Sequence, residues 1–340
     1  MLDNLPPELL DYTFDLIRSP LPQLWREIRL WKSRLGALKS LAAVDGQSPL
    51  WSGVRVVMLG SGSGCMAAEV LQRMVNLEEL KLSAVRDPGD ISGLSNLPNL
   101  RVLCLYCTNL PASFSSPFPS LHQLSLFPYY PASKEAVSQF FVPAIFPALR
   151  ALSLEGSYTG NQAPLAALEG ALLTQLEMLN LGCGLLPAIT PALFRASTPV
   201  LLSVAAVDLE NSATLPTLLS AVAPHICLIN DWGFGENHPV STAAVHTLLT
   251  LVLSSSRPRS LHLPEQLTRN LYIADDVYLL SSHVQLNAAV KTLRTACESE
   301  RVEVHWRADR RLDVLRDLWA YAKRLKAAQQ AVEDEKRSGQ

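Results

Sequence analysis

The residues with the clearest chemical potential form a glycine-rich segment, Gly60-Ser61-Gly62-Ser63-Gly64. An apolar run, VRVVML (54–59), precedes it and a segment with helical character, MAAEVLQRM (66–74), follows it. Glycines let a backbone approach a ligand closely, and the free N–H groups at the start of a helix attract anions. The pattern therefore makes residues 60–64 a candidate loop for binding a nucleotide or S-adenosylmethionine.

This segment resembles the first motif of Rossmann-type methyltransferases. Such a site also needs an acidic residue at the end of the next strand to hold ribose hydroxyls. The next strand-like run is NLEELKLSAV (76–85), and the nearest acidic residue, Asp87, already lies in a Pro-Gly loop. The glycines also lie between Leu59 and Leu82, which are as far apart as Leu82 and Leu105. An irregular first repeat of a longer array is therefore the favoured interpretation, with the methyltransferase as the alternative.

Other chemistry-bearing residues do not form recognisable sets. Cys104 and Cys107 are a lone pair, and on a strand they project to opposite faces, so they are unsuited to bind one zinc ion together. The seven histidines are dispersed along the chain. No serine or cysteine nucleophile stands in a recognisable order with a histidine and an acid. The sequence therefore indicates a non-enzymatic protein with no cofactor and no metal.

Charge and composition limit which classes of partner the protein can bind and in which cellular compartment it is expected. A net charge of −2 and 18% charged residues give no general attraction to nucleic acid. Two uncharged stretches, 211–230 and 239–256, are long enough to raise the question of a membrane span, but buried repeat segments explain them better. The N-terminus has no signal-peptide pattern, and the six cysteines form no disulfide framework. We expect a cytoplasmic or nuclear protein that binds neither nucleic acid nor membrane.

One apolar phrase recurs along the chain. It reads NLEELKL at 76–82, NLRVLCL at 99–105 and SLHQLSL at 120–126, and it ends again at Leu154 and Leu181. The order Leu-x-x-Leu-x-Leu resembles the signature of leucine-rich-repeat proteins. This resemblance implies an α/β solenoid, in which a curved parallel sheet has helices on its convex side and a single repeat cannot fold alone.

The repeat region is expected to span residues 52–308. Beyond Leu181 the phrase weakens, but strand-like runs persist at 200–207, 225–229, 260–263 and 301–306. Helices are expected between strands, among them 134–142, 163–173, 187–196, 213–222, 240–253 and 284–299.

The N-terminal segment, residues 1–51, is expected to be helical. Pro7 and Glu8 suit the first turn of a helix over 1–17. Its opening, LPPELLDYTF (5–14), resembles the start of an F-box, and Leu50-Trp51 resembles its end, although Asp45 stands where the family has a cysteine. The resemblance implies docking on the Skp adaptor of a cullin-based ubiquitin ligase. The docking residues that it implies are Leu5, Pro6, Leu9, Leu10 and Phe14.

The C-terminal segment, residues 309–340, is expected to form a capping helix and a polar tail. One helical face carries Leu312, Leu315, Trp319, Ala322 and Leu325. Because a repeat array needs its open ends covered, we expect this helix to close the end of the stack. Beyond Ala328 the sequence is polar and is expected to fray.

Strand alternation is expected to expose the residues between the leucines on the concave face of the sheet. Tyr106 and Phe127 would be neighbours there, either offered to a substrate protein or folded back onto the repeat edge. The expected recognition residues are Lys81, Tyr106, Phe127, Tyr129, Glu155, Tyr158 and Asn180. The leading hypothesis is thus a substrate receptor of a ubiquitin ligase, and the alternative is a repeat scaffold with no ubiquitin role.

Overall fold

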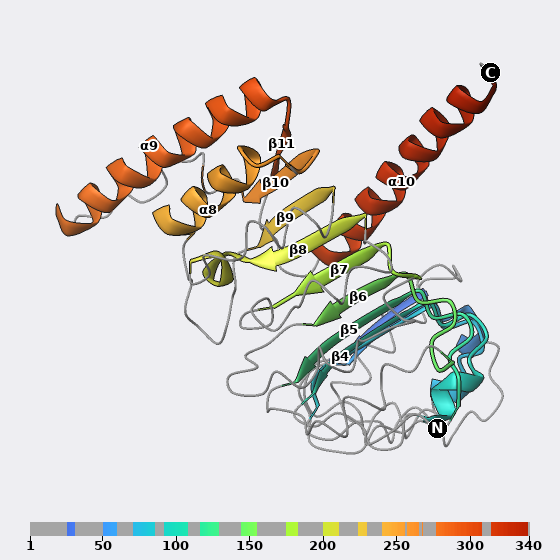
Figure 1. Ribbon diagram of the computed structural model, residues 1–340. Helices are drawn as coiled ribbons and strands as arrows, with labels where there is room; N and C mark the ends of the chain where they lie inside the picture. The colour runs from blue at the N-terminus through green and yellow to red at the C-terminus, as the bar shows by residue number, and fades with distance from the viewer. Residues whose placement is uncertain are drawn as a thin grey trace. The chain divides into compact units, whose positions relative to one another are not determined.

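The computed structural model shows two compact units, Met1–Leu149 (unit 1) and Arg150–Gln340 (unit 2) (Figure 1). The described residues are 26–30, 50–59, 71–85, 92–107, 116–128, 144–154, 175–182, 200–210, 224–229, 240–255, 257–264, 267, 277–307 and 314–338. The helix expected at 1–17, the glycine segment at 60–64 and the helices expected between 134 and 222 lie outside them.

Unit 1 contains a sheet of parallel strands whose spatial order follows the sequence. The strands are β1 (Glu27–Leu30), β2 (Val56–Leu59), β3 (Glu79–Val85), β4 (Val102–Cys107) and β5 (Gln123–Pro128). Their register aligns Leu80 with Leu103 and Leu124, and Leu82 with Leu105 and Leu126. All six leucines are at most 1% exposed. Equivalent leucines of successive phrases therefore share common apolar layers, which is what stabilises the stack.

Connecting segments complete each turn of unit 1. They include a short helix, α3 (Leu50–Gly53), and a 3-10 helix, η3 (Ser92–Asn96). Phe118 and Phe146 stack in the interior with their ring centroids 5.8 Å apart. Both rings are at most 2% exposed, so they extend the leucine layers into the connections.

Asparagines at the start of two leucine phrases connect neighbouring turns of unit 1. Asn76 Nδ2 donates to the carbonyl oxygen of Ser52 at 2.8 Å. Asn99 Nδ2 donates to the carbonyl oxygen of Val75 at 3.3 Å and to Asn76 Oδ1 at 3.3 Å. Each asparagine thus reaches back to the preceding turn and satisfies a backbone carbonyl that the strand ladder does not use.

Unit 2 has the same architecture, with longer connections between its strands. Its parallel strands are β6 (Ala151–Leu154), β7 (Met178–Leu181), β8 (Leu201–Ala205), β9 (His225–Ile229), β10 (Ser260–Pro264) and β11 (Glu303–Arg307). Leu152, Leu179, Leu202, Ile226, Leu261 and Val304 lie at equivalent register positions. A 3-10 helix, η7 (Ala206–Leu209), follows β8.

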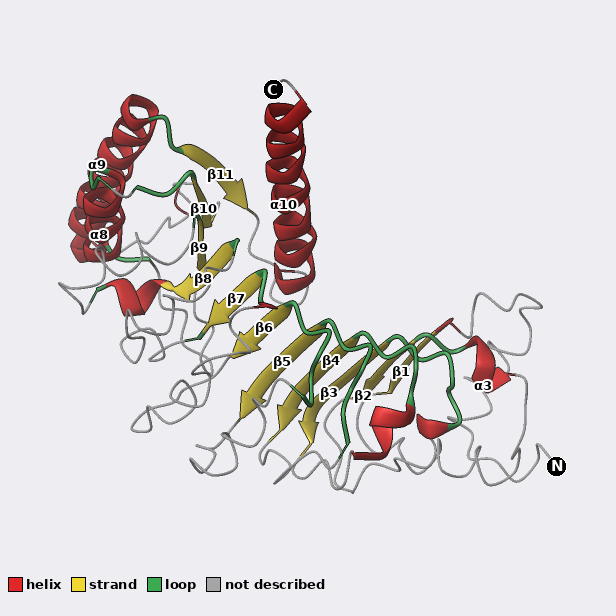
Figure 2. Cartoon of the chain, turned by 45° about the vertical axis from the view of Figure 1, so that its right-hand side comes forward, coloured by secondary structure: helices red, strands yellow, loops and turns green. Residues whose placement is uncertain are grey.

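Helices lie on both sides of the unit 2 sheet. α8 (Thr242–Val252) begins at Ser241, whose side chain accepts a hydrogen bond from the Ala244 N–H, and it buries an apolar face. α9 (Val277–Glu300) runs beside α8, whereas α10 (Val314–Ser338) lies on the opposite side of the sheet (Figures 1 and 2).

The described parts of both units are thus segments of an α/β repeat solenoid with a parallel sheet. This confirms the solenoid predicted from the recurring phrase, and it confirms strands in each of the four weaker runs beyond Leu181. The helices expected at 240–253 and 284–299 are also confirmed, as α8 and within the longer α9.

Two expectations about the ends of the chain are wrong. Residues 1–51 are not helical throughout, because Glu27–Leu30 forms β1, which pairs in parallel with β2. α10 does not close the end of the stack beyond β11. It packs instead on a face of the sheet, through Ala322. Its helical structure also continues through the polar residues to Ser338, since Lys and Arg near a helix C-terminus and good helix formers support it.

Candidate functional site

The strands of unit 2 present a second face, opposite the leucine interior, that is also buried. We call it the α10 face. Every residue of β6, β7 and β8 is buried, so both sides of these strands are covered. The α10 face consists of the residues that alternate with the interior leucines, namely Ala151, Ser153, Met178, Asn180, Leu201, Ser203 and Cys227. All seven are at most 2% exposed.

α10 packs on this face through one small residue and two flanking aromatics. Ala322 is fully buried and lies in one cluster with Ala151, Met178, Leu201 and Cys227. Trp319 and Tyr321 are partly buried against the same cluster. An alanine without a longer side chain lets the helix backbone approach the strands closely, while the aromatic rings cover apolar area on either side.

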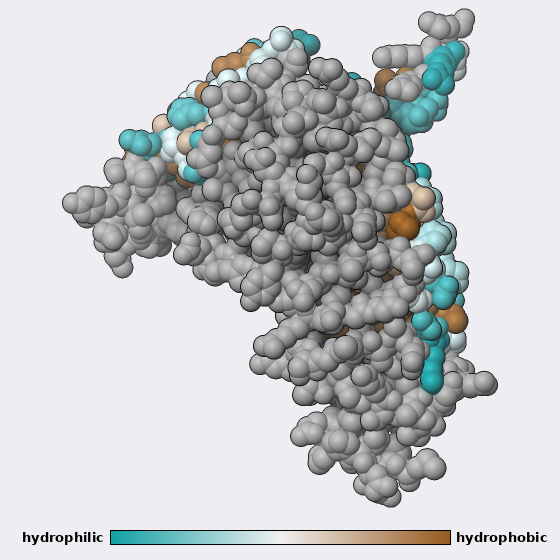
Figure 3. All heavy atoms as spheres, turned by 60° about the horizontal axis from the view of Figure 1, so that its bottom comes forward, coloured by the Kyte–Doolittle hydropathy of each residue, from teal (hydrophilic) through white to brown (hydrophobic). Residues whose placement is uncertain are grey.

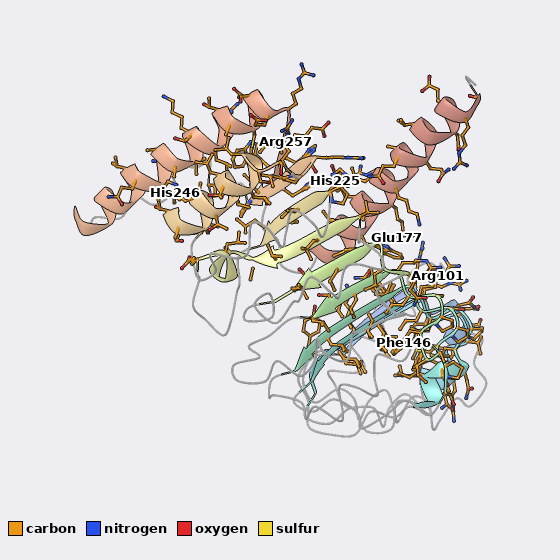
Figure 4. All side chains as sticks on the ribbon, in the orientation of Figure 1. Arg101, Phe146, Glu177, His225, His246 and Arg257 are labelled. Atoms are coloured by element: carbon orange, nitrogen blue, oxygen red, sulfur yellow. The ribbon has the colours of Figure 1, made fainter. Side chains whose placement is uncertain are left out.

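An ion pair ties α10 to the edge of the face. Lys326 Nζ lies 2.6 Å from Glu177 Oε1, and Arg150 Nε lies 4.0 Å from the same oxygen. The lysine side chain is 55% exposed and the glutamate 15% exposed. Figure 4 shows Glu177 among the side chains on the strands near the start of α10. Because the lysine is largely in water, this pair contributes at most about 1 kcal/mol.

Three histidines, a serine and a tyrosine meet where α10 covers β9 to β11. This histidine cluster consists of His225, Ser260, His262, His305 and Tyr321. Ser260 Oγ lies 2.7 Å from His225 Nδ1 and 3.2 Å from His262 Nε2. The rings of His262 and His305 stack 4.6 Å apart, and the Tyr321 ring meets His262 edge-on at 4.3 Å.

Burial favours the neutral form of two members of the cluster, His225 and Tyr321. Burial lowers the pKa of His225 to about 4, and the Arg259 charge adds to this effect while Glu303 opposes it. Burial raises the pKa of the Tyr321 hydroxyl. Ser260 is completely buried, so its hydroxyl cannot attack a substrate from solution. The cluster therefore suits a packing and orienting role beneath α10 better than nucleophilic catalysis.

Two polar atoms on the α10 face have no partner among the described residues. Asn180 Nδ2 donates to Ser153 Oγ at 2.8 Å, but Asn180 Oδ1 and Ser203 Oγ are without a hydrogen bond. These two residues are neighbours in the β7–β8 register. A buried oxygen without a donor is costly, so its presence on a covered face marks a place where a donor group from elsewhere can bind.

The face of unit 1 that was expected to carry recognition residues is only partly exposed to solvent. Lys81 is half-buried and pairs with Glu79 at 2.7 Å on the same face of β3. Tyr106 is half-buried in β4 and lies opposite Phe127 of β5 in the register, which places these two positions side by side as expected. The general exposure expected for this face is wrong, because Gln123 and Ser125 are 5% and 2% exposed.

The exposure expected for Asn180 in unit 2 is also wrong. Asn180 was expected on an open concave surface, but it is 1% exposed because α10 and its neighbours cover β7. The other residues expected to bind a partner lie outside the described part of the chain. They are the adaptor-docking residues Leu5, Pro6, Leu9, Leu10 and Phe14 and the recognition residues Tyr129, Glu155 and Tyr158.

The histidine cluster was not identified from the sequence, because its members are far apart in the chain. A signal was present, since His225, His262 and His305 each stand at a position facing away from the leucine interior in three successive strands. Only the adjacency of β9, β10 and β11 makes these positions neighbours.

Comparison with known proteins leaves the family open. No protein-family model matches the chain, and the comparison with curated proteins found no significant match. Among the described residues, no group of three or more His, Cys, Asp or Glu side chains is arranged to hold a metal ion. No helix in the described ranges is both long and apolar enough to cross a membrane.

Proposed function

We propose that the protein is a non-enzymatic recognition protein built from leucine-rich repeats. The observation that supports this most is the register of the sheet, in which leucines of successive Leu-x-x-Leu-x-Leu phrases occupy the same apolar layers. The side chains opposite such an interior form the surface that repeat proteins use for binding other proteins, and in unit 2 this surface is covered by α10.

The proposed partners are the Skp adaptor of a cullin-based ubiquitin ligase and a substrate protein. The adaptor would bind the N-terminal residues that resemble an F-box, with Leu9 and Phe14 at the centre of the docking helix. The substrate would bind the sheet side, and the setting would be cytoplasmic or nuclear. An apolar helix face that binds a partner is a common mode of recognition.

Co-precipitation with the adaptor tests this role. The double variant Leu9→Asp/Phe14→Asp places two charges on the proposed docking face, and we expect adaptor recovery to fall at least tenfold, about 1.4 kcal/mol or more. The control, Tyr12→Asp/Thr13→Asp, makes the same charge change at two positions within 5–14 that are not among the expected docking residues. Equal recovery of the wild type and both variants would refute the adaptor role.

A specific observation favours the alternative, a repeat scaffold with no ubiquitin role. β1 lies inside the segment that resembles an F-box, yet it pairs with β2 as part of the repeat sheet. If residues 1–51 act only as the covered end of the array, deleting them exposes the edge of β2 and the protein aggregates. Aggregation of the deletion variant, together with no adaptor recovery by the wild type, would select the scaffold.

The methyltransferase alternative is disfavoured by strand order. Dinucleotide-type sites lie where the strand order of a doubly wound sheet reverses. β2, which precedes the glycine segment, instead lies between β1 and β3, and the described strands of unit 1 follow the sequence without reversal. Isothermal calorimetry with S-adenosylmethionine provides the direct test, and heat of binding at micromolar protein would revive this alternative.

A further inference from the structure

We propose that the α10 face is a binding site for an amphipathic helix of a partner protein, and that α10 occupies this site until the partner displaces it. This inference rests on the recognition role proposed above, and it names both the surface and the class of partner.

The contact between α10 and the sheet has the chemistry of a helix bound in a groove. Ala322 allows close approach at the centre, and Trp319 and Tyr321 provide the aromatic contacts beside it. Lys326 follows one helical turn later and pairs with Glu177 at the edge of the face. A small residue between aromatics, followed by a basic residue, is therefore the pattern that this surface accepts.

α10 satisfies the apolar part of the face and leaves its polar part unsatisfied. Asn180 Oδ1 and Ser203 Oγ are neighbours in the register, and their residues are 1% and 0% exposed. Neither atom has a hydrogen-bond partner in the described structure. Strand alternation places both residues on the same face as Met178 and Leu201, which contact Ala322. A partner helix that brings a hydroxyl or amide donor to these oxygens therefore binds the face better than α10 does.

The described contacts between α10 and the sheet lie within residues 319–326. Among the side chains of α10 that are described, which are those of residues 319–338 except 333 and 336, Ala322 is the one that is fully buried. Lys323, Arg324 and Lys326 are exposed. The protruding part of α10 is mainly hydrophilic on the side seen in Figure 3. Besides Ala322, the described contacts of α10 are the Tyr321 ring against His262 and His305, the partly buried Trp319 and the exposed Lys326–Glu177 ion pair. The helix has the further advantage over a partner that it is tethered to the same chain.

Hydrogen exchange on the full-length wild-type protein tests whether α10 opens. We expect the amides of residues 319–326 to exchange at least about 100-fold faster than those of β7 and β8, because local opening requires less free energy than unfolding the unit. If these amides exchange only as slowly as the strands, α10 is a fixed part of unit 2 and the proposal is overturned.

A labelled peptide tests whether the face accepts a helix in trans. The probe is a synthetic peptide of residues 314–338 with an N-terminal fluorophore, and binding to full-length protein is followed by anisotropy. Lys326→Glu places like charges at the Glu177 contact and loosens the tethered helix, so we expect the probe to bind this variant about tenfold more tightly than the wild type. Arg337→Glu makes the same charge change on an exposed part of α10, and it should behave as the wild type does.

A compensating pair makes the site assignment specific. The Glu177→Lys protein should bind the probe weakly and bind a probe carrying Lys326→Glu at least about tenfold more tightly, since the swap restores opposite charges across the face. Absence of this preference would show that the peptide binds elsewhere.

The remaining outcomes also decide the matter. If the Lys326→Glu and wild-type proteins bind the probe equally, or if neither binds it, a helix in trans cannot use the face. If Lys326→Glu forms dimers by light scattering, the occupant is a second copy of this chain and the partner assignment is wrong. If the variant does not fold, hydrogen exchange of the wild-type protein decides whether α10 opens.

Adaptor co-precipitation does not involve α10. Failure of the proposed adaptor role and failure of the proposed helix-binding site are therefore separate results.

Discussion

Ser153 and Ser203 occupy equivalent positions on neighbouring parts of the α10 face, yet their hydroxyls differ in what they contact. Ser153 Oγ accepts a hydrogen bond from Asn180 Nδ2 at 2.8 Å, whereas Ser203 Oγ has no partner among the described residues. The two substitutions to alanine should therefore affect stability in different directions.

We expect Ser153→Ala to lower the free energy of unfolding by about 1–3 kcal/mol, because it leaves the buried Asn180 amide without its acceptor. Ser203→Ala removes a buried hydroxyl without a partner, so stability should be unchanged or rise by about 1 kcal/mol. Urea denaturation of both variants checks the contrast. A loss of equal size in the two proteins would contradict this account of the face.

His225 makes the stability of unit 2 depend on pH. Its folded-state pKa of about 4 lies below the ordinary value of 6.5, so the unfolded chain binds the proton more readily. Stability is therefore independent of this group above pH 6.5, falls as the pH drops from 6.5 towards 4, and loses at most about 3 kcal/mol.

Urea denaturation between pH 7.5 and 4 measures this dependence. We expect His225→Gln to reduce the slope of stability against pH, since the substituted side chain does not titrate. His246, labelled with His225 in Figure 4, is exposed on α8, and His246→Gln should retain the slope of the wild type. An unchanged slope in His225→Gln would assign the pH dependence to other groups.

At the scale of the repeat, the asparagine column connects successive turns of unit 1. Asn76 donates to Ser52 and accepts from Asn99, so Asn76→Ala removes two hydrogen bonds that cross between turns. We expect a loss of about 1–2 kcal/mol in the free energy of unfolding. Asn96→Ala, at an exposed position of η3, should change stability by less than about 0.5 kcal/mol in the same urea titration. Equal effects would mean that the column is not structural.

The helices α8 and α10 differ in how much of their packing could be predicted from the sequence. α8 buries one face composed of Ala244, Val245, Leu248, Leu251 and Val252, a spacing visible in the sequence. α10 carries a comparable apolar stripe. Such a stripe indicates that the helix packs against another part of the protein, but it does not identify the surface on which the helix packs. The same stripe is compatible with closing the end of the stack and with covering the sheet, and only the contacts of Ala322 distinguish them.

At the scale of the whole molecule, each unit depends on stacking of turns that cannot fold singly. Leu103 lies between Leu80 and Leu124 in a common layer and is fully buried. We expect Leu103→Ala to cost about 2–5 kcal/mol and to increase hydrogen exchange in β3, β4 and β5 together, because the cavity weakens both neighbouring contacts.

Val75→Ala provides the control, since Val75 is 49% exposed. Its exchange pattern should match that of the wild type. If Leu103→Ala raises exchange in β4 alone, the turns are energetically independent and the stacking account of unit 1 is wrong.

The sequence alone determined the repeat, the parallel strands and their register, because the spacing of leucines along a strand is a local property that dictates which side faces the core. It did not predict β1, in which Ile28 and Leu30 match only the last two apolar positions of the phrase and pair in register with Val57 and Leu59 of β2. The burial of Asn180, the meeting of His225, His262 and His305, and the position of α10 were decided by tertiary structure. Each depends on contacts between residues distant in the chain, and the pattern of a single segment carries no information about which surface will cover it.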